Sequence, residues 1–217
     1  MKNLLIFDLD GTLLNTIADL AQSTNHALAA CGFPTHPVES YPHFVGDGIN
    51  KLFERALPEN ERTEVNVLCV RSHFVPYYDA HNADLSTPYD GMVNLLSHLQ
   101  TKGVKLAVAS NKYQVATEKL VAHFFPNIQF EAVFGQREGI AVKPNPAIVN
   151  DIIAIAQVDK ADILYVGDSG VDMQTARNSE VESVGVTWGF RPEAELIEYE
   201  ATHIVHQAAD ILKYVGL

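Results

Sequence analysis

Leu4-Leu5-Ile6-Phe7-Asp8-Leu9-Asp10-Gly11-Thr12-Leu13 opens with four apolar residues, which predicts a short strand buried on both faces. Two carboxylates, Asp8 and Asp10, follow one residue apart, and Gly11 and Thr12 end the strand. Buried carboxylates cost free energy unless a positive charge offsets them. The stretch therefore predicts a core strand with a divalent cation, and with it chemistry, at the carboxyl end.

Further apolar runs follow along the chain, and helix-like patterns separate them. The stronger strand candidates are residues 104–109, 163–166 and 184–186, and the weaker ones are residues 132–134 and 204–205. Strands that alternate with helices form right-handed βαβ units, which build a parallel sheet covered by helices on both faces. We therefore predict an α/β fold, a Rossmann-like doubly wound parallel sheet. Ligands bind such sheets at the carboxyl ends of the strands.

Residues 15–81 interrupt this alternation with three helical patterns and no strand pattern. The first pattern starts at Thr16-x-x-Asp19, which predicts a capping box, and Pro76 is expected to end or kink the third. We predict a small α-helical cap domain over residues 15–81, inserted into an α/β core domain of residues 1–14 and 82–217.

Composition excludes several classes of protein. The chain is 47% hydrophobic, but its apolar runs are too short to span a membrane, and the N-terminal run is interpreted as a core strand, not a signal peptide. A net charge of −12 without a Lys/Arg cluster argues against nucleic acid as a partner. The two cysteines, Cys31 and Cys69, cannot form a disulfide framework, and we expect reduced thiols in a cytoplasmic protein.

Four groups of polar residues fall at predicted strand ends or in loops on one rim of the sheet. Each group alone is explained by helix capping or by an ordinary loop. Together they supply what phosphoryl transfer needs: a nucleophile, an acid/base, donors to oxygen, a cation and metal ligands. The groups are Asp8 and Asp10, Ser110 and Asn111, Lys143 before Pro144, and Asp168, Ser169 and Asp172.

These motifs, in this order, resemble those of the haloacid dehalogenase superfamily phosphatases that carry a helical cap, and the resemblance covers essentially the whole chain. Ser110-Asn111-Lys112, Lys143-Pro144-Asn145-Pro146 and Thr187-Trp188-Gly189 are most similar to the phosphoglycolate phosphatase group. The resemblance implies Mg²⁺-dependent hydrolysis of a small phosphorylated metabolite through an aspartyl-phosphate. We expect a monomer or a homodimer.

The resemblance also implies roles for the residues that follow the first strand. Asp8 is the nucleophile, and Asp10 protonates the leaving oxygen and later deprotonates water. Gly11 permits the turn that brings both carboxylates to one site. Thr12 is expected to hold Asp10 through its hydroxyl.

The remaining motifs receive phosphate and metal roles by the same resemblance. Ser110, Asn111 and Lys143 bind phosphoryl oxygens, and Lys143 also offsets the charge near Asp8. Mg²⁺ is held by the Asp8 carboxylate, the Asp10 carbonyl oxygen and the Asp168 carboxylate. Ser169 supports this loop, and Asp172 is a support or an alternate ligand. The chain has Asn15-Thr16 where the family often has Asp-Ser, so one negative charge near the metal is missing.

Alternatives remain within this chemistry. Dehalogenation is disfavoured, because halide leaves without a proton and does not need Asp10. A mutase of the phosphoglucomutase kind uses the same aspartyl-phosphate, and a pyrophosphatase is a third enzyme class; the motifs exclude neither. A non-enzymatic regulatory module is disfavoured, because Asp8, Asp10, Lys143 and Asp168 are all present.

The cap is the expected source of substrate selection. The Gly46-Asp47-Gly48 loop precedes the second cap helix, and Gly48 is a candidate substrate-side residue. Lys51 and Arg55 lie four residues apart on that helix, and one of them is a candidate to bind a substrate carboxylate. The competing interpretation is a solvated helix face, the usual place for charged side chains.

Overall fold

The computed structural model describes residues 1–216, and within them the core is a six-stranded parallel sheet. Each strand pairs with its neighbours in parallel, which confirms the predicted doubly wound α/β fold. The strand order is β5 (Ala132–Gln136), β4 (Lys105–Tyr113), β1 (Leu4–Phe7), β6 (Ile163–Gly167), β7 (Glu182–Val186) and β8 (His203–Val205).

Helices cover both faces of the sheet because successive side chains of β1 point to opposite sides. Leu5 and Phe7 pack with α4 (Met92–Thr101) and α5 (Gln114–Phe124). Leu4 and Ile6 pack with α6 (Ala147–Ala156) and α7 (Gly170–Asn178). The shorter core elements are α8 (Glu193–Glu198), α9 (Leu212–Val215) and the 3₁₀ turns η3 (Lys160–Asp162) and η4 (Ala208–Ile211).

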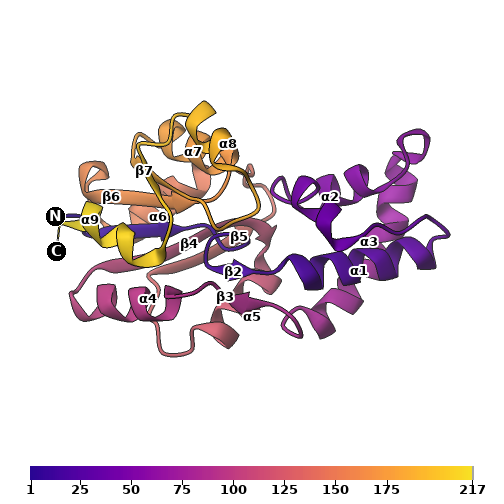
Figure 1. Ribbon diagram of the computed structural model, residues 1–217, viewed down its shortest axis with the longest axis horizontal. Coiled ribbons are helices and arrows are strands. Elements are labelled where there is room, and N and C mark those ends of the chain that lie inside the picture. The colour runs from indigo at the N-terminus through magenta and orange to yellow at the C-terminus, as the bar shows by residue number, and fades with distance from the viewer. Residues whose placement is uncertain (217) are drawn as a thin grey trace.

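The predicted helical insertion forms a body of its own at one end of the molecule, opposite the two chain termini (Figure 1). It contains α1 (Ile17–Ala30), η1 (Val38–His43), α2 (Ile49–Ala56), η2 (Glu59–Glu61) and α3 (Glu64–His81). The helix α3 continues through Pro76 and does not end there. Two short antiparallel strands, β2 (Leu14–Asn15) and β3 (Thr87–Pro88), connect this body to the core. We call it the cap.

The predicted capping box at the start of α1 is wrong. Thr16 is the N-cap residue, but its side chain makes no capping hydrogen bond, and its hydroxyl donates to Asp10 Oδ1 at 2.6 Å. The carboxylate of Asp19 accepts hydrogen bonds from the backbone N–H groups of Leu85 and Ser86, just before β3. Both side chains therefore tie the cap to the rest of the chain and do not close the first helical turn.

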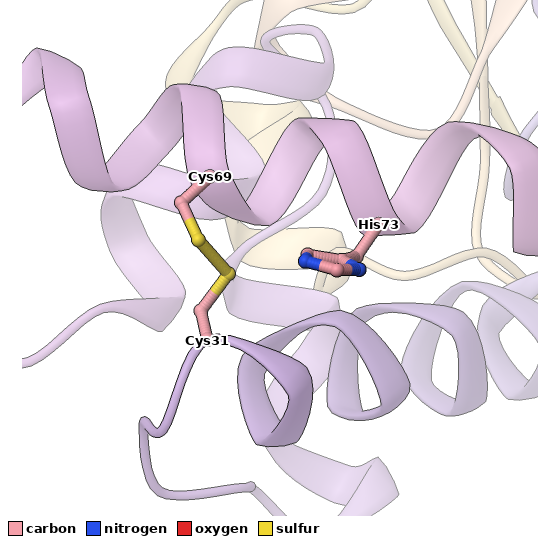
Figure 2. Close-up of side chains that lie close together, drawn as sticks. All are labelled: Cys31, Cys69 and His73. Atoms are coloured by element: carbon pink, nitrogen blue, oxygen red, sulfur yellow. A yellow bond between two sulfur atoms is a disulfide. The ribbon is translucent and has the colours of Figure 1, made fainter.

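The expectation of two reduced thiols is also wrong. Cys31, at the carboxyl end of α1, and Cys69, on α3, form a disulfide within the cap (Figure 2). The pairing results from helix packing, because α1 and α3 lie against each other and bring two cysteines 38 positions apart into contact. The His73 ring lies beside the sulfur atoms, one turn further along α3 (Figure 2). Within residues 1–216, no helix combines the length and the apolar character needed to cross a membrane.

Candidate active site

The chain leaves strand geometry immediately after β1. The N–H of Asp8 still donates to the Val166 carbonyl of β6 at 2.9 Å, but the N–H groups of Leu13 and Leu14 both turn back to the Leu9 carbonyl. Gly11 has a φ of +90°, and a Cβ at this position would overlap the Asp168 carboxylate. This turn lets Asp8 and Asp10 line the same pocket although they are one residue apart.

Lys143 is a buried cation between two carboxylates. Its Nζ lies 2.8 Å from Asp8 Oδ1 and 2.7 Å from Asp172 Oδ1, and only 2% of its side chain is exposed. Burial raises the pKa of Asp8 to about 7, a rise that Lys143 opposes and Asp172 increases. Burial alone would lower the pKa of Lys143, but Asp172 and Asp8 raise it, so the ammonium group keeps its charge.

Three buried carboxylates meet at this point. Oxygens of Asp8, Asp168 and Asp172 lie within 4.8 Å of one another. Burial raises the pKa of Asp168, and the charges of Asp172 and Asp8 raise it further. One lysine cannot balance three carboxylates, and clustered oxygen donors suit a hard divalent cation such as Mg²⁺. The donor set therefore fits the metal that the sequence predicts.

Asp168 is held in place by two neighbouring loops. Its Oδ2 accepts a hydrogen bond from the backbone N–H of Phe190 at 2.7 Å, and its Oδ1 lies 3.4 Å from the Thr12 hydroxyl. A Cβ at Gly189 would overlap the Asp168 side chain, so the loop after β7 approaches this closely only with glycine there. The predicted role of Thr12 changes, because its hydroxyl reaches Asp168 and not Asp10.

Asp172 lies in the first turn of α7 and also pairs with Lys143. Ser169 and Asp172 form a capping box, in which the Asp172 N–H donates to Ser169 Oγ and the Ser169 N–H donates to Asp172 Oδ2. Ser169 Oγ also donates to Asp172 Oδ2 at 2.6 Å. The other oxygen, Oδ1, accepts from Lys143 Nζ and from the Tyr165 hydroxyl. The Asp172 carboxylate thus both caps α7 and holds the Lys143 ammonium group beside Asp8.

Asp10 has two partners that sequence reasoning missed. Thr16 donates to Oδ1, and Lys112 Nζ lies 3.0 Å from both carboxylate oxygens. The strand β4 continues to Tyr113, beyond the predicted end at residue 109, and this extension carries Lys112 into the pocket. The spacing Ser110-x-Lys112 was a usable signal, since alternate strand residues share a face.

The predicted phosphate-binding residues also line the pocket, but their side chains are engaged. Ser110 Oγ accepts from the N–H of Lys112 at 3.2 Å. The Asn111 amide accepts from the Lys143 N–H at 2.8 Å and donates to the cap carbonyl of Gly46 at 3.0 Å. Asn111 therefore joins the β4 end, the Lys143 loop and the cap.

The cap candidates divide into two groups. Gly48 lines the pocket, whereas Lys51 and Arg55 are not among its lining residues. Lys51 is exposed and pairs with Glu54 at 2.6 Å. Arg55 pairs with Asp47 and donates to the Phe44 carbonyl at 3.1 Å. The predicted site residues of the core thus lie together, whereas Lys51 and Arg55 pair with carboxylates of the cap outside the pocket lining.

Arg191 is a further pocket residue, in the loop after the strand predicted at residues 184–186. It follows β7 in the core, and its guanidinium donates to the cap carbonyls of Pro42 at 2.7 Å and Val45 at 2.9 Å. It therefore connects the core to the cap at the edge of the pocket.

Comparisons with known proteins point to a single family. The family model of the haloacid dehalogenase-like hydrolases matches residues 5–186. The chain belongs to this family. It is 34% identical over 216 residues to the phosphoglycolate phosphatase of Agrobacterium fabrum, covering 96% of this chain and 90% of the relative. It is 30% identical to the phosphoglycolate phosphatase of Mesorhizobium japonicum, covering 94% of this chain and 90% of that relative.

Solved structures agree with the sequence relatives. A structure from Lactobacillus delbrueckii subsp. bulgaricus, described as that of a candidate phosphoglycolate phosphatase, superimposes with a TM-score of 0.93 at 34% identity and covers 99% of both chains. The expected family, and the expectation that this member is a phosphatase, are confirmed by these matches.

Proposed function

We propose that this enzyme is a Mg²⁺-dependent phosphatase that hydrolyses 2-phosphoglycolate through an aspartyl-phosphate on Asp8. The observation that carries the proposal is the separation of roles in one pocket: Asp8 is paired with Lys143, and Asp10 is held independently by Thr16 and Lys112. The two relatives named phosphoglycolate phosphatase support this choice of substrate.

Asp8 is suited to attack phosphorus. Lys143 holds its Oδ1, which leaves Oδ2 for the substrate. The Oδ2–P bond forms as the ester P–O bond breaks, and the leaving oxygen takes a proton from Asp10. In the second half, Asp10 removes a proton from water, which attacks phosphorus and releases Asp8 and inorganic phosphate.

Three groups would hold Mg²⁺: the carboxylates of Asp8 and Asp168 and the main-chain carbonyl oxygen of Asp10. The cation would supply positive charge to the phosphoryl oxygens as negative charge builds up on them. Thr12 and the Phe190 N–H keep the Asp168 carboxylate facing the pocket. Lys143, Ser110 and Asn111 line the same pocket as Asp8, which supports their proposed role in binding the phosphoryl group.

The cap, as residues 15–81 with hinges at β2 and β3, excludes water during transfer. The pocket is complete within one chain, so a monomer suffices and a homodimer is compatible. We infer a cytoplasmic enzyme from its small-metabolite substrate alone, because the cap disulfide removes the argument from reduced thiols.

The test is a phosphate-release assay with purified enzyme, with Mg²⁺ and with EDTA. The panel contains 2-phosphoglycolate, sugar phosphates, nucleotides and pyrophosphate. We expect release from 2-phosphoglycolate that requires Mg²⁺ and is abolished in Asp8→Asn, with an unchanged circular dichroism spectrum. Conversion of β-glucose 1-phosphate without phosphate release would instead identify a mutase, and activity on none of the esters would refute the proposal.

A further inference from the structure

Two polar groups of the pocket, Lys112 and Tyr78, are not used to bind the phosphoryl group in the chemistry described above. Lys112 is a core residue at the end of β4, and 4% of its side chain is exposed. Tyr78 is a fully buried residue of the cap helix α3. Lys112 Nζ lies 4.9 Å from the centre of the Tyr78 ring, so the two groups approach each other across the junction between core and cap.

The Tyr78 hydroxyl lacks a hydrogen-bond partner among residues 1–216. A buried hydroxyl without a partner is unfavourable and uncommon in native structures. Burial raises the pKa of Tyr78 far above that of a free tyrosine, so the hydroxyl keeps its proton and can donate it. Because Tyr78 lines the pocket, a bound molecule with an acceptor oxygen would satisfy this group.

Lys112 is the pocket cation best placed to bind a second anion. Of the cations that line the pocket, Lys143 is held between Asp8 and Asp172, and Arg191 donates to two cap carbonyls. Lys112 pairs only with Asp10 among the described carboxylates. The surrounding wall is mainly apolar and consists of Leu20, Ile49, Leu52, Phe74 and Phe190.

We propose that Lys112 and Tyr78 together bind the carboxylate of the substrate and thereby select short phosphorylated carboxylates over neutral phosphate esters. This inference rests on the proposed function. Asp10 must face the ester oxygen, and Lys112 Nζ lies only 3.0 Å from Asp10. An anion bound by Lys112 therefore lies close to the ester oxygen, as in 2-phosphoglycolate, where a single CH₂ separates that oxygen from the carboxylate.

The test compares 2-phosphoglycolate with 2-hydroxyethyl phosphate, in which a neutral CH₂OH replaces the carboxylate. The measured quantity is the ratio of kcat/KM for the two esters. We expect Lys112→Gln to lower this ratio by about 10- to 100-fold, as for loss of a charge-assisted hydrogen bond, and Lys112→Arg to restore part of it. Tyr78→Phe, which leaves the Lys112–Asp10 pair intact, should lower the ratio by about 3- to 10-fold.

Matched variants make the result decisive. Lys102→Gln removes an exposed lysine that caps the carboxyl end of α4 and does not line the pocket, and it should leave the ratio unchanged. Equal losses for both esters in Lys112→Gln, with no change of ratio in Tyr78→Phe, would show that Lys112 only positions Asp10 and would overturn the inference. A selective loss in Lys51→Ala or Arg55→Ala would overturn it by placing the anion site on α2.

The two proposals fail in different ways. If the unaltered enzyme does not hydrolyse 2-phosphoglycolate, the proposed function is wrong, and the carboxylate site falls with it. If it hydrolyses both esters equally well and the ratio does not respond to Lys112 or Tyr78, the phosphatase stands and the carboxylate site does not.

Discussion

Asp10 shows how a carboxylate is prepared for one task at the scale of a single residue. Thr16 and Lys112 hold its oxygens, whereas Asp8 is paired with Lys143. We expect Asp10→Asn to reduce kcat for 2-phosphoglycolate by about 100- to 10,000-fold, because an alkoxide needs a proton to leave. An aryl phosphate should lose much less, since its leaving group is a weaker base. Equal losses in steady-state assays of both esters would argue against the acid role.

The two threonines near the first strand contact different carboxylates, so we expect their roles to be separable. Thr12 contacts Asp168, a proposed metal ligand, whereas Thr16 contacts Asp10. Thr12→Val should therefore raise the Mg²⁺ concentration needed for half-maximal activity by about 10-fold. Thr16→Val should lower kcat at saturating Mg²⁺ and leave that concentration unchanged. Magnesium titrations of both variants check this. If Thr12→Val instead lowers kcat at saturating Mg²⁺ and leaves the Mg²⁺ requirement unchanged, Thr12 acts on Asp10, as the sequence predicted.

At the scale of elements, the disulfide between α1 and α3 stabilises the cap by restricting the unfolded chain. It closes a loop between positions 38 apart, for which about 2–4 kcal/mol is typical. We expect Cys31→Ser to lower the free energy of unfolding by this amount in urea titrations. Turnover should persist, because neither cysteine lines the pocket. Cys31→Ser under reducing conditions should match the reduced parent protein; a further loss of stability there would assign the effect to packing and not to the bond.

The sequence allowed prediction of the sheet, the inserted helices and the residues at the strand ends, because buried strands and helix faces have strong periodic patterns. It did not allow prediction of what depends on distant contacts. The hydroxyl of Thr16 could cap α1 or reach Asp10, and only the turn at Gly11 decides between them. The pairing of Cys31 with Cys69 depends on how α1 packs on α3, and the role of Lys112 depends on the extension of β4.

At the scale of the whole molecule, we expect the carboxylate cluster to make metal binding depend on pH. The pKa of Asp8 is raised to about 7 in the metal-free fold, above its value in the unfolded chain. The folded state therefore binds this proton more tightly, a contribution to stability that is present at low pH and is lost as pH rises toward 7. Under the proposed function, Mg²⁺ would replace this proton when it binds. The increase of Tm on adding Mg²⁺ should be larger at pH 8 than at pH 5, and equal increases in thermal melts would contradict this.

The junction of core and cap offers a second whole-molecule prediction. Arg191 is the core cation that donates to cap carbonyls at two positions beside the pocket. Arg191→Met should raise KM for 2-phosphoglycolate by about 10-fold, because the closed arrangement loses two charge-assisted hydrogen bonds. Tm should change little in comparison. A change of Tm without a change of KM would assign Arg191 to stability alone.

The acceptors of Arg191 are main-chain carbonyls of Pro42 and Val45, not side chains. Every amino acid offers the same carbonyl, so the side chains at these two cap positions are free to change without removing the acceptors. A cap of different sequence could therefore be grafted between β2 and β3 and still accept hydrogen bonds from Arg191. The condition is that the backbone at positions 42–45 follows the same path. The contact of Arg191 with the cap is thus independent of the cap side chains that line the pocket, and the two can diverge separately.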